Sequence, residues 1–226
     1  MACGLFGKLP AKRDFVALSA SREFLKVWET WVQAGISGSR VTLAEDWREA
    51  FLRAPIWRFW LGADVCGVTV AGAFMPSVDG VGRYFPLTVF ARLEHIPPPE
   101  LDPQEAWFAA AEEFLLSALA TDTTFETLSE TLGRLSPPLD GLVKAPPEQM
   151  TRLADGSIVL PATPANLPAA LANIRVEDYT RAYAGSTYWW TSGGEGFEPF
   201  VLSGKHMPSP YVFTGMLTGR FEHLFP

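Results

Sequence analysis

The segment MPSVDGVGRYFP, residues 75–86, separates two stretches with the composition of β-strands, and it constrains the fold more than any other feature. These stretches cover residues 66–74 and 85–93, where valine and other strand-forming residues recur. The turn dipeptide Asp79-Gly80 between them indicates a local antiparallel connection. We therefore expect two neighbouring strands joined by a loop whose backbone is partly fixed by proline and glycine.

Helical patterns alternate with the strand-forming stretches. Ser21 can cap a segment whose apolar residues share one face, and Gly35 stands where a helix commonly ends. Thr42 and Glu45 form a capping-box pattern before a second apolar run, which Pro55 stops. Four further helices are expected later in the chain. Helix pairs between groups of strands predict an α/β fold with one mixed β-sheet and helices on both faces.

Length and composition favour one domain over residues 1–226. The chain has 226 residues, of which 48% are hydrophobic, enough for one large core. The longest mostly apolar stretch, residues 65–75, is well short of the roughly 20 residues that cross a bilayer. At the N-terminus the basic residues follow a short apolar patch, the reverse of a secretory signal. We expect a cytoplasmic protein without membrane insertion.

Several functional classes are disfavoured by composition and motif content. The net charge of −7 opposes binding to nucleic acid. Cys3 and Cys66 lack the spacing of a zinc or redox motif and are expected to be small buried hydrophobic residues. The three histidines stand apart, and the sequence motifs of P-loops, dinucleotide-binding turns and serine hydrolases are absent. We therefore expect no catalytic residue, no metal and no cofactor.

The first candidate binding segment is GLFGKLPAKRDF, residues 4–15. Gly7 frees the backbone and Pro10 restricts it, so that Lys8 and Asp14 would be presented in defined positions. The alternative is an N-terminal strand and turn with a solvated lysine. The residues alone leave both interpretations open.

The second candidate is Arg58 in PIWRFW, residues 55–60. In a strand, Trp57 and Phe59 face one way while Arg58 and Trp60 face the other. Arg58 would then either reach an edge of the sheet or form a structural pair with a carboxylate.

The third candidate is the loop between the two strands. Asp79 and Arg83 either hydrogen-bond to each other and to free loop amides, or Arg83 acts with Tyr84 and Phe85 as an interface anchor. Ser77 lies on the same loop, but no base is near it in sequence. The loop is thus a candidate for binding or for shaping its own backbone.

The fourth candidate is STYWWTSGGEG, residues 186–196. Trp189 and Trp190 are adjacent, so the two side chains of one strand must lie on opposite faces of the sheet. Each is either covered by helices as part of a core or exposed to a partner.

Four segments taken in order resemble the TagF family, accessory proteins of the bacterial type VI secretion system. They are GLFGKLPAKRDF, EDWREAFLRAPIWRF, GVTVAGAFMPSVDGVGRYFPLTVF and STYWWTSGG. The resemblance is strongest over residues 4–92. It implies a three-layer α/β/α sandwich. It also implies a non-enzymatic, posttranslational repressor of the secretion system that acts by binding a component, with the forkhead-associated scaffold protein as the expected partner.

The family's shared positions include the candidates above but carry no catalytic role. The residues expected to bind a partner or to shape a loop are Lys8, Asp14, Arg58, Ser77, Asp79, Arg83, Tyr84, Trp189 and Trp190. One alternative function is an enzyme or small-ligand sensor with a pocket around Ser77, Asp79 and Arg83, with Lys8 or Arg58 as further donors to an anion. A structural subunit of the secretion apparatus is the third hypothesis.

Overall fold

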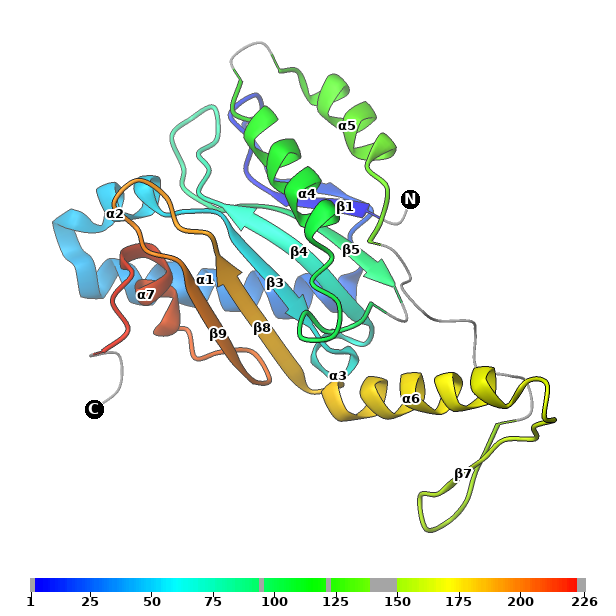
Figure 1. The fold of residues 1–226 in the computed structure, drawn as a ribbon. Coiled ribbons are helices and arrows are strands. Elements are labelled where there is room, and N and C mark those ends of the chain that lie inside the picture. Colours follow the sequence, from blue (N-terminus) through cyan, green and yellow to red (C-terminus); the bar gives the residue numbers. More distant parts are fainter. Residues whose placement is uncertain (1–2, 94–95, 121–122, 139–149, 223–226) are drawn as a thin grey trace.

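The computed structural model describes residues 3–93, 96–120, 123–138 and 150–222. Its centre is a seven-stranded β-sheet with the order β2-β1-β5-β4-β3-β8-β9 (Figure 1). The strands of this sheet are β1 (Cys3–Gly7), β2 (Val16–Leu18), β3 (Trp57–Leu61), β4 (Thr69–Met75), β5 (Leu87–Leu93), β8 (Ser186–Thr191) and β9 (Phe200–Lys205). A separate hairpin consists of β6 (Thr151–Arg152) and β7 (Ile158–Val159). The helices are α1 (Arg22–Leu43), α2 (Trp47–Arg53), α3 (Ala63–Cys66), α4 (Glu105–Ser117), α5 (Phe125–Arg134), α6 (Leu167–Tyr183) and α7 (Val212–Thr218).

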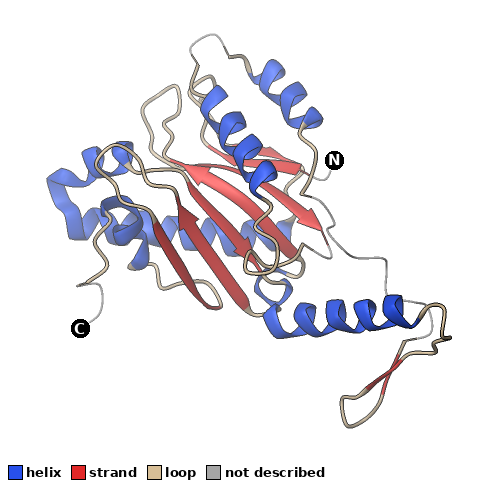
Figure 2. Ribbon diagram, viewed as in Figure 1, coloured by secondary structure: helices blue, strands red, loops and turns tan. Residues whose placement is uncertain are grey.

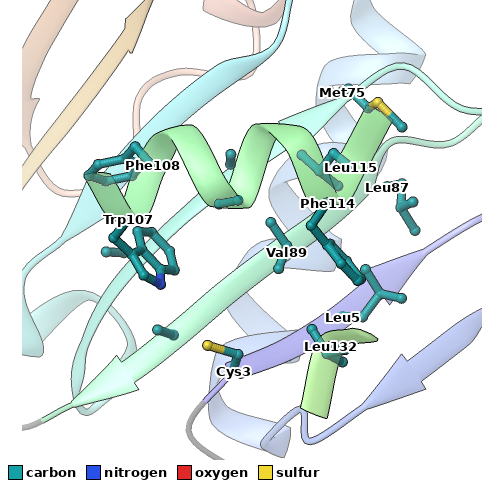
Figure 3. Close-up of a cluster of buried hydrophobic side chains, with 14 of the residues drawn as sticks. Cys3, Leu5, Met75, Leu87, Val89, Trp107, Phe108, Phe114, Leu115 and Leu132 are labelled. Atoms are coloured by element: carbon teal, nitrogen blue, oxygen red, sulfur yellow. The ribbon is translucent and has the colours of Figure 1, made fainter. Parts of the chain in front are cut away.

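Helices cover both faces of the sheet, which gives the expected three-layer α/β/α arrangement (Figure 2). On one face, α4 directs Trp107 and Phe114 toward β1 and β5, with α5 beside it (Figure 3). On the other face lie α1, α2 and α7, and the Trp28 ring of α1 stacks on Trp189 of β8 with centroids 5.8 Å apart. Each face therefore has its own apolar core, and the predicted α/β class is confirmed.

The sheet is antiparallel, and the expectation of a mixed sheet was wrong. Every pair of neighbouring strands in the described sheet is antiparallel. β2 and β3 do run in the same direction and are connected across the sheet by α1, but three strands separate them. After β5 the chain passes through α4, α5 and α6 before it enters β8. β8 begins at the same end of the sheet as the one at which β5 ends. The helices therefore cover faces without creating a parallel neighbour.

The first helix begins as predicted and ends later than predicted. Ser21 Oγ accepts a hydrogen bond from the Phe24 amide at 3.3 Å, as an N-cap does. α1 continues through Gly35 to Leu43. A Cβ atom at position 35 would lie 2.6 Å from Cγ of Phe213, so the glycine allows α7 to approach α1 and does not end the helix.

The expected capping box at Thr42 was also wrong. The Thr42 hydroxyl donates to the carbonyl of Gly38 at 3.1 Å, within the last turn of α1. A 3₁₀ turn then leads directly into α2, which begins at Trp47 and ends at Arg53, two residues before Pro55. The packing of its buried face stabilises α1 past residue 42, so the Thr42 pattern does not begin a new helix.

Cys3 and Cys66 are both buried free cysteines, as predicted. Burial raises the pKa of each thiol to about 11. Neither thiol is therefore poised as a thiolate nucleophile at neutral pH.

α6 projects from one end of the sheet toward the β6–β7 hairpin (Figure 1). Its Leu167 and Leu171 side chains are exposed. The Tyr183 hydroxyl at its C-terminal end donates to Glu100 at 2.9 Å. None of the helices in the described part of the chain is long and apolar enough to cross a membrane.

Candidate functional site

The loop of residues 76–86 is the tip of the β4–β5 hairpin, so the predicted antiparallel connection is confirmed. Val78 and Tyr84 form an isolated antiparallel bridge across the loop. Inside that bridge, the Asp79 amide donates to the Arg83 carbonyl at 3.1 Å and the Gly82 amide donates to the Asp79 carbonyl at 3.0 Å. The tip is thus a hydrogen-bonded turn centred on Asp79.

The Asp79 carboxylate is buried and receives four hydrogen bonds. Its Oδ1 atom accepts from the amides of Val81 and Arg83 at 3.1 and 2.9 Å. Its Oδ2 atom accepts from Arg83 Nε at 2.7 Å and from Lys8 Nζ. Burial alone would raise the pKa of Asp79, but hydrogen bonds from Lys8, Arg83 and Val81 hold it well below its ordinary value of 3.8.

Lys8 reaches Asp79 because the chain turns sharply after β1. Gly7 has a φ of 135°, and a Cβ there would lie 2.0 Å from the carbonyl oxygen of Pro86. Only glycine allows this approach of the two backbones. Lys8 is buried, with its ammonium also 5.0 Å from the centre of the Phe15 ring. Neither expectation for Lys8, a presented group or a solvated one, was right, because the charge is neutralised inside the protein.

Arg83 links Asp79 to the chain segment that follows β1. Its Nη2 atom donates to the carbonyl oxygen of Arg13 and lies 3.8 Å from the Asp14 carboxylate. The Gly80 amide donates to the Lys12 carbonyl at 2.9 Å. These contacts join residues 10–15 to residues 76–86, and we call the joined segments the two-loop junction.

The outer side of the two-loop junction is exposed. The side chains of Arg83 and Asp14 are 56% and 96% exposed, and Phe15 and Val81 are 46% and 55% exposed. Phe15 is nevertheless held by an edge-on contact with Phe85 at 4.8 Å between centroids. The junction thus presents apolar, aromatic and charged groups on a support of buried hydrogen bonds. Phe15 and Val81 were not among the predicted residues, since their exposure has no signal in the sequence.

Ser77 and Tyr84 support the loop from within. Ser77 is buried, its carbonyl accepts from the Phe85 amide at 3.1 Å, and its hydroxyl has no partner among the described residues. Tyr84 packs edge-on against Trp47 and Phe51 of α2, with centroids 5.4 and 5.7 Å apart. Both residues fit the loop-shaping role. The buried Asp79 pairs with Lys8 and Arg83, which disfavours the hypothesis of a ligand pocket around Ser77.

Arg58 belongs to a different cluster, on the face covered by α4. Its Nε and Nη2 atoms donate to the two oxygens of Glu112 at 2.6 and 3.1 Å, and Nη1 donates to Glu105 at 2.7 Å. Burial alone would lower the pKa of Arg58, but these two carboxylates raise it above its ordinary value. The predicted carboxylate pair is confirmed. The sequence analysis did not predict its partners Glu105 and Glu112, although their spacing of seven residues places both on one face of a helix.

The two adjacent tryptophans lie on opposite faces, as predicted. Trp189 is fully buried, 4.8 Å from Trp31 between ring centroids, so it is a core residue and its side chain is not exposed to a partner. Trp190 is half-buried on the other face and packs edge-on against Phe108 of α4 at 4.7 Å. Arg58 is its register partner on β3.

Clefts in the described part of the chain also lie away from the two-loop junction. One, of about 300 Å³, is lined by Asp46 of the 3₁₀ turn and by residues of α2, α7 and the β8–β9 connection, among them Glu49 and Arg53. Another, of about 620 Å³, lies between the start of α4 and the end of α5 and includes Trp107 and Leu135. The described residues contain no group of three or more His, Cys, Asp or Glu side chains placed to hold a metal ion.

The fold and the two-loop junction define an α/β/α protein with an exposed face that is supported by a buried ion pair and its hydrogen bonds. Residues 4–135 match the family described as TagF N-terminal domain, Type VI secretion system-associated, so the chain belongs to this family. Protein PA0076 from Pseudomonas aeruginosa PAO1, known from a crystal structure, is 31% identical, with a TM-score of 0.76 over 99% of this chain and 98% of that chain. No curated protein sequence matches the chain.

Proposed function

We propose that this chain is a non-enzymatic, cytoplasmic repressor of the type VI secretion system that acts posttranslationally by binding a component of the system. The forkhead-associated scaffold protein is the proposed partner. Membership of a family associated with this secretion system supports the setting. Repression and the choice of partner follow from the resemblance described above and are the parts that need an experiment.

The observation that carries the proposal is that the two-loop junction combines buried, mutually paired charges with exposed side chains. Lys8 and Asp79 are buried and satisfy each other, so neither is available to a substrate as a general acid, base or anion-binding group. Outside them, Phe15, Val81 and Arg83 are exposed on a backbone that these buried charges hold in place. Aromatic and arginine side chains on a rigid support are typical anchors of protein interfaces.

The test is co-purification of the forkhead-associated protein with variants of the exposed face. Val81→Asp combined with Arg83→Ala removes an apolar contact and the guanidinium, and we expect capture to fall at least about tenfold, as loss of an interface anchor does. Secretion should rise in cells that carry this variant. Arg53→Ala is the matched control, because Arg53 is also an exposed arginine (61%) in an i,i+4 pair, with Glu49.

Two outcomes would contradict the proposal. Normal capture and normal repression by the folded double variant would remove the junction from the interface. Loss of repression by a folded Ser77→Ala variant with normal capture would favour the enzyme or sensor, because the Ser77 hydroxyl is buried and contacts no partner in the described structure.

A further inference from the structure

The strand β9 forms an open edge of the large sheet. It is last in the strand order, and no described strand pairs with its outer side (Figure 1). Natural sheets usually block such edges with a proline, a bulge or a central charge. The run FVLSGK contains no proline, pairs with β8 over six consecutive residues without a bulge, and has its only charge at the end, on Lys205. Val201 near its start is 79% exposed.

The hydrogen-bonding groups of this edge can be assigned from the register. Ser186 of β8 pairs with Lys205, and the Ser186 carbonyl accepts from the Gly62 amide at 2.9 Å, on the side of β8 away from β9. Backbone groups of an antiparallel pair alternate between bonding inward and pointing outward. The N–H and C=O groups of Lys205, Ser203 and Val201 therefore point to the open side, where another strand can bond to them.

The charges at the two ends of β9 are opposite. Glu198 is exposed just before the strand and Lys205 is exposed at its end. The Lys205 ammonium donates to Ser186 Oγ at 3.0 Å and to the Ala182 carbonyl at 3.5 Å, so one of its three N–H groups has no acceptor among the described residues. A second β9 strand in antiparallel orientation places the acidic end of one copy beside the basic end of the other. Such a self-complementary edge fits a two-fold axis.

From these observations we infer that β9 is a self-association edge, through which two copies of this chain join their sheets by antiparallel β9–β9 pairing. Proline at position 199 confines the pairing to the strand itself. A contact of six residues a side is small compared with a stable interface. The dimer is therefore weak and concentration-dependent, with a dissociation constant of about 10 µM to 1 mM. This inference goes beyond the proposed function and does not depend on it.

Sedimentation velocity of the full chain over a concentration series tests the inference. We expect the wild type to shift from monomer to dimer as its concentration rises. Val201→Lys places a charge in the middle of the edge and should weaken association at least about tenfold. Val41→Lys is the matched control, because Val41 is a similarly exposed valine (84%) on α1 and the change in net charge is the same.

Four further variants separate strand pairing from general surface effects. Ser203→Pro removes an outward N–H and no bond to β8, so it should give a folded monomer. Glu198→Lys and Lys205→Glu should each weaken the dimer, and the variant that carries both should recover it. Thermal melting checks that every variant is folded.

The inference is overturned by a wild type that stays monomeric up to about 1 mM, or by a dimer that folded Val201→Lys and Ser203→Pro leave intact. A monomeric Val201→Lys variant that still captures the forkhead-associated protein would support self-association and leave the proposed function standing. Loss of capture by the junction variant with normal dimerisation would support the proposed function and leave self-association through β9 standing.

Discussion

Asp79-Gly80 and Asp155-Gly156 are the same dipeptide at the tips of two antiparallel hairpins, and they lie in opposite surroundings. The local chemistry is shared: Oδ1 of each aspartate accepts a hydrogen bond from the amide two residues later, Val81 at 3.1 Å and Ser157 at 2.9 Å. Asp155 is exposed. Asp79 is buried and receives Lys8 and Arg83 as well.

The difference teaches that an aspartate-glycine turn needs only its own residues to form, but needs distant ones to become part of a core. Lys8 is 71 positions from Asp79 in the chain. Without that lysine, the buried carboxylate would lack a cation on its inner side, which is costly in a low-dielectric interior. The β6–β7 turn has no such cost, because its Asp155 carboxylate is exposed to solvent.

The largest expected effect is that of Asp79→Ala. This variant leaves the Lys8 ammonium buried without its carboxylate and frees two loop amides, so we expect the melting temperature to fall by more than about 5 °C. Thermal unfolding followed by circular dichroism measures it. If the variant melted within about 1 °C of the wild type, the buried pair would not hold the junction together.

The second expected effect is that the loss of stability on replacing Asp79 depends on pH. The pKa of Asp79 in the folded protein lies below its ordinary value of 3.8, so its stabilising contribution is fully present above that pH and is lost as the pH falls below it. The difference in unfolding free energy between the wild type and Asp79→Asn should therefore shrink from about pH 6 to about pH 3. Urea titrations at each pH measure it, and a constant difference would argue against the charged pair.

The smallest expected effect is that of Asp155→Ala. The hydrogen bond from the Ser157 amide lowers the pKa of Asp155 as well, but the carboxylate is exposed, so solvent screens its interactions. We expect a change in melting temperature of less than about 1 °C. A loss as large as that of Asp79→Ala would show that the aspartate-glycine turn itself, and not the buried pair with Lys8, carries the stability.

Much of the local structure could be predicted from the sequence because its causes are local. Alternation of side chains placed Trp57 and Arg58 on opposite faces of β3, and Ser21 marked the start of α1. The Asp79-Gly80 dipeptide marked the turn of the β4–β5 hairpin. The pattern of helices and strands was also enough to predict an α/β class.

Only the tertiary structure decided which of these local features are buried, paired or free. Gly35 lies inside α1, at the point where Phe213, far along the chain, packs closely against the helix. Lys8 is an internal counter-ion and Trp189 a core residue because of contacts with segments far away in the sequence. β9 is an open edge because of its place in the strand order of the sheet. A residue's own neighbours in the chain determine its backbone preference, but its burial and its charge partner depend on which distant segments the fold brings beside it.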